Sequence, residues 1–156
     1  MEENKIRQLV ERIGIVCDKE GYPPLAGRLL GCLMLAEPPY KTFDEIVEFL
    51  HASKSAVSNT IKFLESQHMV DYITFSGDRR RYFRLKVETW PQVVQASVEN
   101  LGEMKEKFKE ALQIRSNQYP EFNEGLKDVV LLYEIILDIF PQVLERWDEL
   151  RKKKTL

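Results

Sequence analysis

The sequence predicts a mainly α-helical protein with one small β-hairpin. Apolar residues recur at spacings of three and four through most of the 156 residues, which is typical of amphipathic helices. Residues 70–85 are instead rich in β-branched and aromatic side chains around a glycine turn, which favours two strands. With 44% hydrophobic and 31% charged residues, and only 7 Gly and 7 Pro, the composition is that of an ordered globular chain.

Two helices are predicted at the start of the chain. Residues 6–17 carry an apolar stripe on one face, and Gly21 ends this helix. A second helix is expected over about residues 25–37, before a Pro-Pro pair, and it is apolar on nearly all sides. We therefore expect the second helix to be buried, with Gly27 and Gly31 allowing another helix to approach closely.

Two short helices joined by a tight turn are predicted next. Thr42, with Glu45 three residues later, matches a capping box and opens a helix of about ten residues. Ser53 is a favourable N-cap and opens the following helix. The inward stripe of this helix is formed by Val57, Ile61 and Leu64. Such a pair constitutes a helix-turn-helix.

A hairpin follows the second of these helices. Residues 70–75 and 79–85 are expected to be its strands, on either side of the turn Ser76-Gly77-Asp78. The order helix, short helix, helix, hairpin is that of a winged helix-turn-helix, with the hairpin as the wing.

Residues 89–156 are predicted to form long helices whose apolar stripes exceed what a small winged domain can cover. Thr89 is expected to cap a helix of about 27 residues, Tyr119-Pro120 to break the chain, and Pro141 to kink or restart the last helix. We therefore expect two parts: 1–88, an N-terminal helix with the winged helix-turn-helix, and 89–156, a helical dimerisation region. Covering the remaining apolar surface requires a homodimer.

Charge is distributed unevenly along the chain. The segment from His51 to Lys86 contains seven basic and three acidic residues, a net charge of +4, whereas the whole chain has a net charge of −2. Such a basic segment on an acidic body indicates a polyanion-binding patch. A solvated helix face and a solvated turn are the alternatives for its two components.

Small polar side chains on one helix face suit the DNA major groove, and arginines at a narrow tip suit the minor groove. Asp78 is expected to brace one of the arginines. The residues predicted to contact double-stranded DNA are Ser53, Lys54, Ser55, Ser58, Asn59 and Lys62 in the helix, and Arg79, Arg80 and Arg81 in the hairpin.

Three segments resemble the winged-helix core of MarR-type regulators: Thr42–Ile46, Ser53–Ser58 and Gly77–Tyr82. With Gly21–Arg28 ahead and Trp90 behind, the chain is most similar to the GbsR branch, over about residues 4 to 92. The resemblance implies a homodimer that binds operator DNA through the helix and the arginine wing. It also implies, for some members, a response to small ligands such as choline.

These observations together predict a DNA-binding transcriptional regulator, a repressor that acts by operator occupation. A winged-helix module for protein-protein assembly, without sequence-specific DNA binding, is the alternative. No enzyme is expected, because the sequence contains no Gly-rich phosphate loop, no Gly-x-Ser-x-Gly elbow and no His-Glu-x-x-His helix. Neither a cofactor nor a membrane span is expected. The acidic N-terminus without an apolar run favours a cytoplasmic setting.

Two further features leave alternatives open. The aromatic residues Tyr22, Tyr40 and Trp90 lie near predicted junctions, where they line a pocket for a small effector or simply fill the core. Cys17 and Cys32 show no paired spacing with the histidines, so no metal site is expected. They are expected to be buried thiols, with redox sensing as the alternative.

Overall fold

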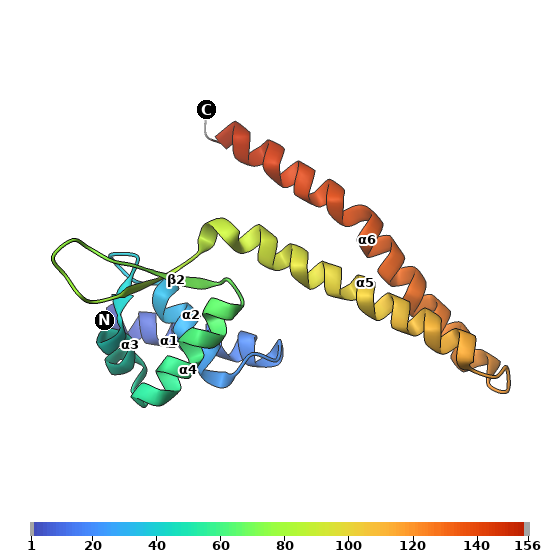
Figure 1. Ribbon diagram of the computed structural model, residues 1–156, viewed down its shortest axis with the longest axis horizontal. Helices are drawn as coiled ribbons and strands as arrows, with labels where there is room; N and C mark the ends of the chain where they lie inside the picture. The colour runs from blue at the N-terminus through green and yellow to red at the C-terminus, as the bar shows by residue number, and fades with distance from the viewer. Residues whose placement is uncertain (1, 155–156) are drawn as a thin grey trace. The chain divides into compact units, whose positions relative to one another are not determined.

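The computed structural model describes residues 2–154 and divides into two compact units, which meet between Trp90 and Pro91. Each unit is described separately below. The first contains four helices, a three-stranded sheet and a short 3₁₀ turn. In chain order these are α1 (Glu2–Lys19), α2 (Pro24–Met34), β1 (Lys41–Thr42), α3 (Phe43–Leu50), α4 (Lys54–Ser66), β2 (Val70–Ile73), β3 (Tyr82–Leu85) and the 3₁₀ turn Val87–Thr89 (Figure 1).

The sheet of the first unit is antiparallel, with β3 in the centre and the strand order β1-β3-β2. Lys41 pairs with Phe83, and Val70 pairs with Leu85. Helices α2, α3 and α4 pack together beside it, and their largest fully buried side chains include Leu29, Ile46, Val57 and Leu64. Val57, Ile61 and Leu64 of α4 are all buried, which confirms the inward stripe predicted from the sequence.

Helices α1 and α2 pack closely because α2 presents glycines to α1. A Cβ atom at Gly27 would lie 2.5 Å from Cys17 Cβ and 2.9 Å from Gly14 Cα. At Gly31 the nearest backbone atom would be Val10 Cα, at 3.2 Å. The two distances at Gly27 are too short for a Cβ atom, and the distance at Gly31 is tighter than ordinary van der Waals contact. The predicted close approach of another helix at this glycine pair is confirmed.

Three boundaries in the first unit differ from the sequence-based prediction. Helix α2 ends at Met34 instead of near residue 37. Pro38 disfavours helical geometry at Glu37, the residue directly before it. The two-residue strand β1 was not predicted, since so short a segment shows no alternation. The hairpin strands are shorter than expected, so the three arginines lie in a loop of residues 74–81, here called the wing loop, which extends away from the helices (Figure 1).

The second unit consists of two long helices, α5 (Trp90–Ile114, whose first residue precedes the division) and α6 (Pro120–Lys154). They run antiparallel: Phe108 packs edge-on against Tyr133 at 6.0 Å, and Lys109 Nζ lies 2.7 Å from Glu134 Oε1. The last turns of α6 separate from α5 (Figure 1).

Two details correct the prediction for residues 89–156: one at Thr89, which belongs to the first unit, and one in α6. Thr89 does not accept a capping hydrogen bond; its hydroxyl donates to the carbonyl oxygens of His68 (2.9 Å) and Lys86 (3.0 Å), and so ties the 3₁₀ turn to the end of α4. Helix α6 begins at Pro120 as predicted and continues through Pro141 as one helix, so of the two outcomes predicted at Pro141, a kink or a restart, the restart is wrong. A single proline removes only one backbone hydrogen bond from a helix of 35 residues.

Candidate nucleic-acid interface

Both helices of the helix-turn-helix begin at a capped residue. Thr42 Oγ1 accepts a hydrogen bond from the Glu45 backbone N–H at 3.3 Å, and Glu45 Oε2 accepts from the Thr42 backbone N–H at 2.7 Å. The Thr42 hydroxyl also donates to this carboxylate, and together these bonds lower the pKa of Glu45. At the second helix, Ser53 Oγ accepts from the Ala56 backbone N–H at 3.2 Å. Both predicted caps are confirmed, and they fix where α3 and α4 begin.

The outward face of α4 carries the side chains that the sequence predicts to contact DNA. Ser55, Asn59 and Lys62 are exposed, while Ser58 is half-buried. Lys54 forms an ion pair with Asp44 of α3 at 3.4 Å, but both side chains are more than 70% exposed, so solvent screens this pair strongly. Lys54 therefore remains available to a phosphate. DNA contact by this face remains a prediction.

Asp78 organises the wing loop. Its carboxylate accepts hydrogen bonds from the Arg80 side chain, with Nη2 at 2.6 Å and Nε at 3.0 Å, and from the Tyr82 hydroxyl at 2.6 Å. It also accepts from the Arg80 backbone N–H at 2.9 Å. These bonds, that of the Arg80 guanidinium first, hold the pKa of Asp78 well below its usual range. The expectation that Asp78 braces one arginine is confirmed, and that arginine is Arg80.

The other two arginines of the wing loop are not held in this way. Arg81 lies over the ring of Tyr72, 4.5 Å from its centroid, an arrangement that orients the guanidinium but leaves its charge uncompensated. Arg79 is exposed and forms no ion pair within residues 2–154. The three consecutive arginines therefore differ, and the free positive charge lies at Arg79 and Arg81.

An aromatic cluster at the base of the wing loop was missed by the sequence analysis. Tyr40, Phe75 and Tyr82 pack against one another with centroid separations of 4.9 to 5.5 Å. Tyr40 precedes β1, so the pairing of β1 with β3 brings it to the hairpin. The sequence does show an aromatic residue in or near each strand. It does not show that β1 pairs with β3, and this pairing is what brings the three rings together.

The aromatics predicted to line an effector pocket are placed in different parts of the structure. Tyr22 packs edge-on against Phe63 of α4 at 6.2 Å, whereas Tyr40 belongs to the wing cluster. Trp90 is 36% exposed at the start of α5. No aromatic ring contact joins any two of these three residues within the described chain, and a ligand there remains a prediction.

Cys32 is buried as expected, whereas Cys17 is only half-buried, and neither cysteine has the environment of a reactive thiol. Burial raises the pKa of Cys32 to about 11, and burial together with neighbouring acids raises the pKa of Cys17. Both therefore remain protonated near neutral pH, and a thiol reacts far more slowly than a thiolate. Among residues 2–154, no group of three or more His, Cys, Asp or Glu side chains is placed to hold a metal ion.

Comparison with known proteins supports this description of the chain. No family model matches it. The chain is 24% identical to the HTH-type transcriptional regulator MmpR5 of Mycobacterium tuberculosis over 147 residues, which cover 94% of this chain and 89% of the relative. A crystal structure of a transcriptional regulator covers 93% of this chain and 99% of its own, with 23% identity and a TM-score of 0.74. The chain has the winged-helix fold. The predicted fold class is thereby confirmed.

More distant similarity is found to other transcription regulators of known structure. MepR, a transcription regulator of the Staphylococcus aureus multidrug efflux pump MepA, is 17% identical over 81% of this chain and 89% of its own. Its TM-score is 0.43.

MmpR5 and the protein with a TM-score of 0.74 are both transcriptional regulators, a non-enzymatic class. This agrees with the prediction that the chain is not an enzyme. Within residues 2–154, no helix has the length and apolar character of a membrane span.

Proposed function

We propose that the chain is a sequence-specific DNA-binding transcriptional regulator, a homodimeric repressor that acts by occupying its operator. The main observation in support of this proposal is the outward face of α4. Ser58, Asn59 and Lys62 form no side-chain hydrogen bond or ion pair within residues 2–154, although the helix that presents them is capped and packed. Uncommitted polar groups on a rigid helix can bind base edges and phosphates without first breaking internal bonds.

Helix α4 and the wing loop then have distinct roles on DNA. With α4 in the major groove, the Asn59 amide can donate to and accept from one adenine edge, while Lys62 and Lys54 neutralise phosphates. The wing loop lies in the adjacent minor groove, where Arg79 and Arg81 meet the most negative potential at A·T tracts. Asp78 and Arg80 shape the loop. A protein seated over the promoter in this way represses by steric exclusion.

The second unit supports dimer formation through a face of α6 that α5 does not cover. Tyr133 and Leu137 face α5, where Leu137 lies near Gly102. At 100° per residue, a second set of large apolar side chains falls within about 160° on the other side of the helix, and all of them are exposed. This set, here called the free α6 face, comprises Leu131, Leu132, Ile135, Ile139, Val143, Trp147 and Leu150.

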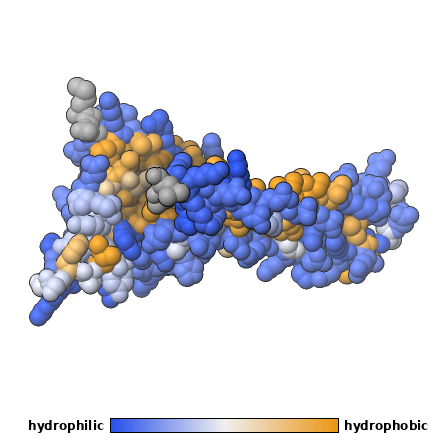
Figure 2. Space-filling model, turned by 90° about the horizontal axis from the view of Figure 1, so that it is seen from above, coloured by the Kyte–Doolittle hydropathy of each residue, from blue (hydrophilic) through white to orange (hydrophobic). Residues whose placement is uncertain are grey.

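The free α6 face places seven exposed large apolar side chains on one side of one helix. Large contiguous apolar patches on a protein surface are typical of protein-protein interfaces. Hydrophobic residues indeed gather in patches on the surface rather than standing singly (Figure 2). We assign residues 89–156 as the dimerisation region, with a contribution from α1, whose Ile15 and Val16 are exposed. Two-fold symmetry would then place two recognition helices about one DNA turn, 10–10.5 bp, apart.

Finer assignments extend the same proposal. Among MarR-type regulators we place the chain nearest the GbsR branch, on the segment Gly21–Arg28 and on Trp90. We further propose that it acts in the cytoplasm and that a small effector modulates DNA binding through differential affinity for two dimer geometries.

A binding experiment tests the DNA-binding proposal against the alternative of a protein-protein module. The full chain is titrated against a labelled random-sequence duplex, and fluorescence anisotropy is followed between 50 and about 200 mM salt. We expect binding that weakens steeply with salt, because each neutralised phosphate contributes about −0.9 to the slope of log affinity against log salt. Absence of binding at 50 mM salt would instead favour the assembly module.

A further inference from the structure

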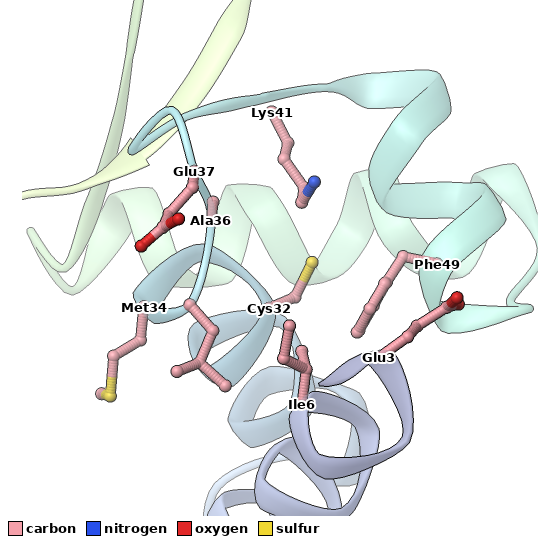
Figure 3. Close-up of a pocket in the computed structure, with 9 residues that line it drawn as sticks. Glu3, Ile6, Cys32, Met34, Ala36, Glu37, Lys41 and Phe49 are labelled. Carbon is pink, nitrogen blue, oxygen red and sulfur yellow. The ribbon is translucent and has the colours of Figure 1, made fainter. Parts of the chain in front are cut away.

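The first unit contains a groove that the DNA-binding proposal does not use. It has a volume of about 620 Å³ and lies between the N-terminal turns of α1, the end of α2, the loop after α2, β1 and the last turn of α3. Its apolar lining includes Leu35. It also includes Ile6, Met34, Ala36 and Phe49, which are labelled in Figure 3. The volume lies within the range of small-molecule sites, about 300–1,000 Å³.

One cation lies inside this groove, and it has no ion-pair partner among residues 2–154. Lys41 is half-buried, and its ammonium group points across the groove toward the sulfur of Cys32 (Figure 3). Cys32 is buried, and burial raises its thiol pKa to about 11, so it offers no negative charge to Lys41 at neutral pH. An unpaired, partly desolvated ammonium gains free energy from an anion that reaches it.

The two carboxylates at the rim do not compete for this ammonium. Glu3 accepts hydrogen bonds from the Arg7 guanidinium, with Nη2 at 3.2 Å and Nε at 3.3 Å, so its charge is already compensated. Glu37 is exposed, and its carboxylate points away from Lys41 (Figure 3). A third carboxylate, that of Glu45, also interacts electrostatically with Lys41, but it does not line the groove and its Oε2 accepts hydrogen bonds from the Thr42 backbone N–H at 2.7 Å and hydroxyl at 2.6 Å. Among the residues that line the inner end of the groove, the charge that an occupant meets is therefore that of Lys41.

Part of the groove wall is rigid. Arg7 Nη1 donates to the Phe49 backbone carbonyl at 2.9 Å, and the same guanidinium lies 4.7 Å from the centroid of the Phe49 ring. Arg7 thus fixes both the ring that lines the groove and the last turn of α3. Met34 is 52% exposed on another wall, and its flexible thioether can adjust to ligands of different shape.

We propose that this groove is a binding site for amphipathic monoanions, in which a carboxylate binds Lys41 and an aliphatic chain lies on Ile6, Met34 and Phe49. The site differs from the predicted pocket of Tyr22, Tyr40 and Trp90, none of which lines it. It is also linked to the elements next to the DNA-binding ones: Lys41 pairs with Phe83 of β3, the strand that follows the wing loop, and the next residue, Thr42, caps α3, the helix before α4. The binding site itself does not depend on DNA binding.

Calorimetric titration of the full chain, without DNA, tests the proposal with octanoate, 1-octanol and trimethyloctylammonium as probes. We expect one octanoate per chain, bound more tightly than the other two probes. Affinity is expected to rise by up to about fourfold for each methylene added from hexanoate to octanoate. The variant Lys41→Met, which retains the apolar stem, should weaken octanoate about tenfold and leave 1-octanol unchanged.

Lys19→Met, at the far end of α1, is the matched control and should bind all three probes like the wild type. No binding of octanoate at millimolar concentration would overturn the proposal. So would equal affinities for octanoate and trimethyloctylammonium, or an equal loss of octanoate and 1-octanol binding in Lys41→Met. The chain-length series uses the wild-type chain, so it tests the apolar part of the site even if the Lys41 variant is unstable.

Discussion

The three arginines of the wing loop should contribute unequally to DNA binding, although they are adjacent in the sequence. Arg80 donates to both carboxylate oxygens of Asp78 at 2.6 to 3.1 Å, so its charge is compensated within the loop. Arg79 and Arg81 have no such partner within residues 2–154. We expect Arg79→Ala and Arg81→Ala each to reduce the salt slope by about 0.9, the contribution of one phosphate contact.

Arg80→Ala should change the salt slope by less than about 0.3, a third of one phosphate contact, because Arg80 is not expected to displace a counterion from DNA. The assay is fluorescence anisotropy on one random-sequence duplex, with affinities measured over a series of KCl concentrations. Lys127→Ala, in the second unit, is the charge-matched control and should leave the slope unchanged. Equal effects of the three alanine variants, or the largest effect at Arg80, would refute the assignment of Arg80 to loop structure.

Three further predictions concern α4, the packing of α1 on α2, and α6. Asn59→Ala should cost about 1–3 kcal/mol of binding free energy on a selected site and less on random DNA, as measured by anisotropy; equal losses would exclude base reading. Gly27→Ala should lower the free energy of unfolding in urea by on the order of 3 kcal/mol, because its Cβ would lie 2.5 Å from Cys17 Cβ. Gly125→Ala, where no atom lies within 4 Å, should raise it by up to about 1 kcal/mol; a similar loss at both glycines would contradict the packing argument. Ile139→Asp should convert a dimer into a monomer in sedimentation velocity, and a wild-type monomer at micromolar concentration would exclude the proposed dimer.

Features that depend on neighbouring residues in the chain could be predicted from the sequence. The caps at Thr42 and Ser53 each join residues three apart, and the inward stripe of α4 follows from helical spacing alone. The hydrogen bond from the Arg80 guanidinium to the Asp78 carboxylate joins residues only two apart. The sequence likewise predicts that Asp78 braces one of the arginines. These interactions need no knowledge of the tertiary structure.

Features that depend on pairing between distant segments could not be predicted. Strand β1 forms because Lys41 and Thr42 pair with β3, about forty residues later in the chain. No local sequence pattern indicates so short a strand. The aromatic cluster around Tyr40 and the Lys41 groove both follow from that pairing. The wing loop is longer than predicted because the ladder between β2 and β3 ends at the pair Ile73 and Tyr82.

Selection of bound sequences from a pool of random duplexes tests the central claim most directly. The full wild-type chain is incubated with the pool near physiological salt, and bound DNA is recovered, amplified and sequenced through several rounds. Operator recognition by a two-fold dimer predicts enrichment of one near-palindromic sequence, with half-sites about 10–10.5 bp apart and an A·T-rich segment where each wing lies. Recovery of unrelated sequences without a common motif would contradict sequence-specific regulation by this chain.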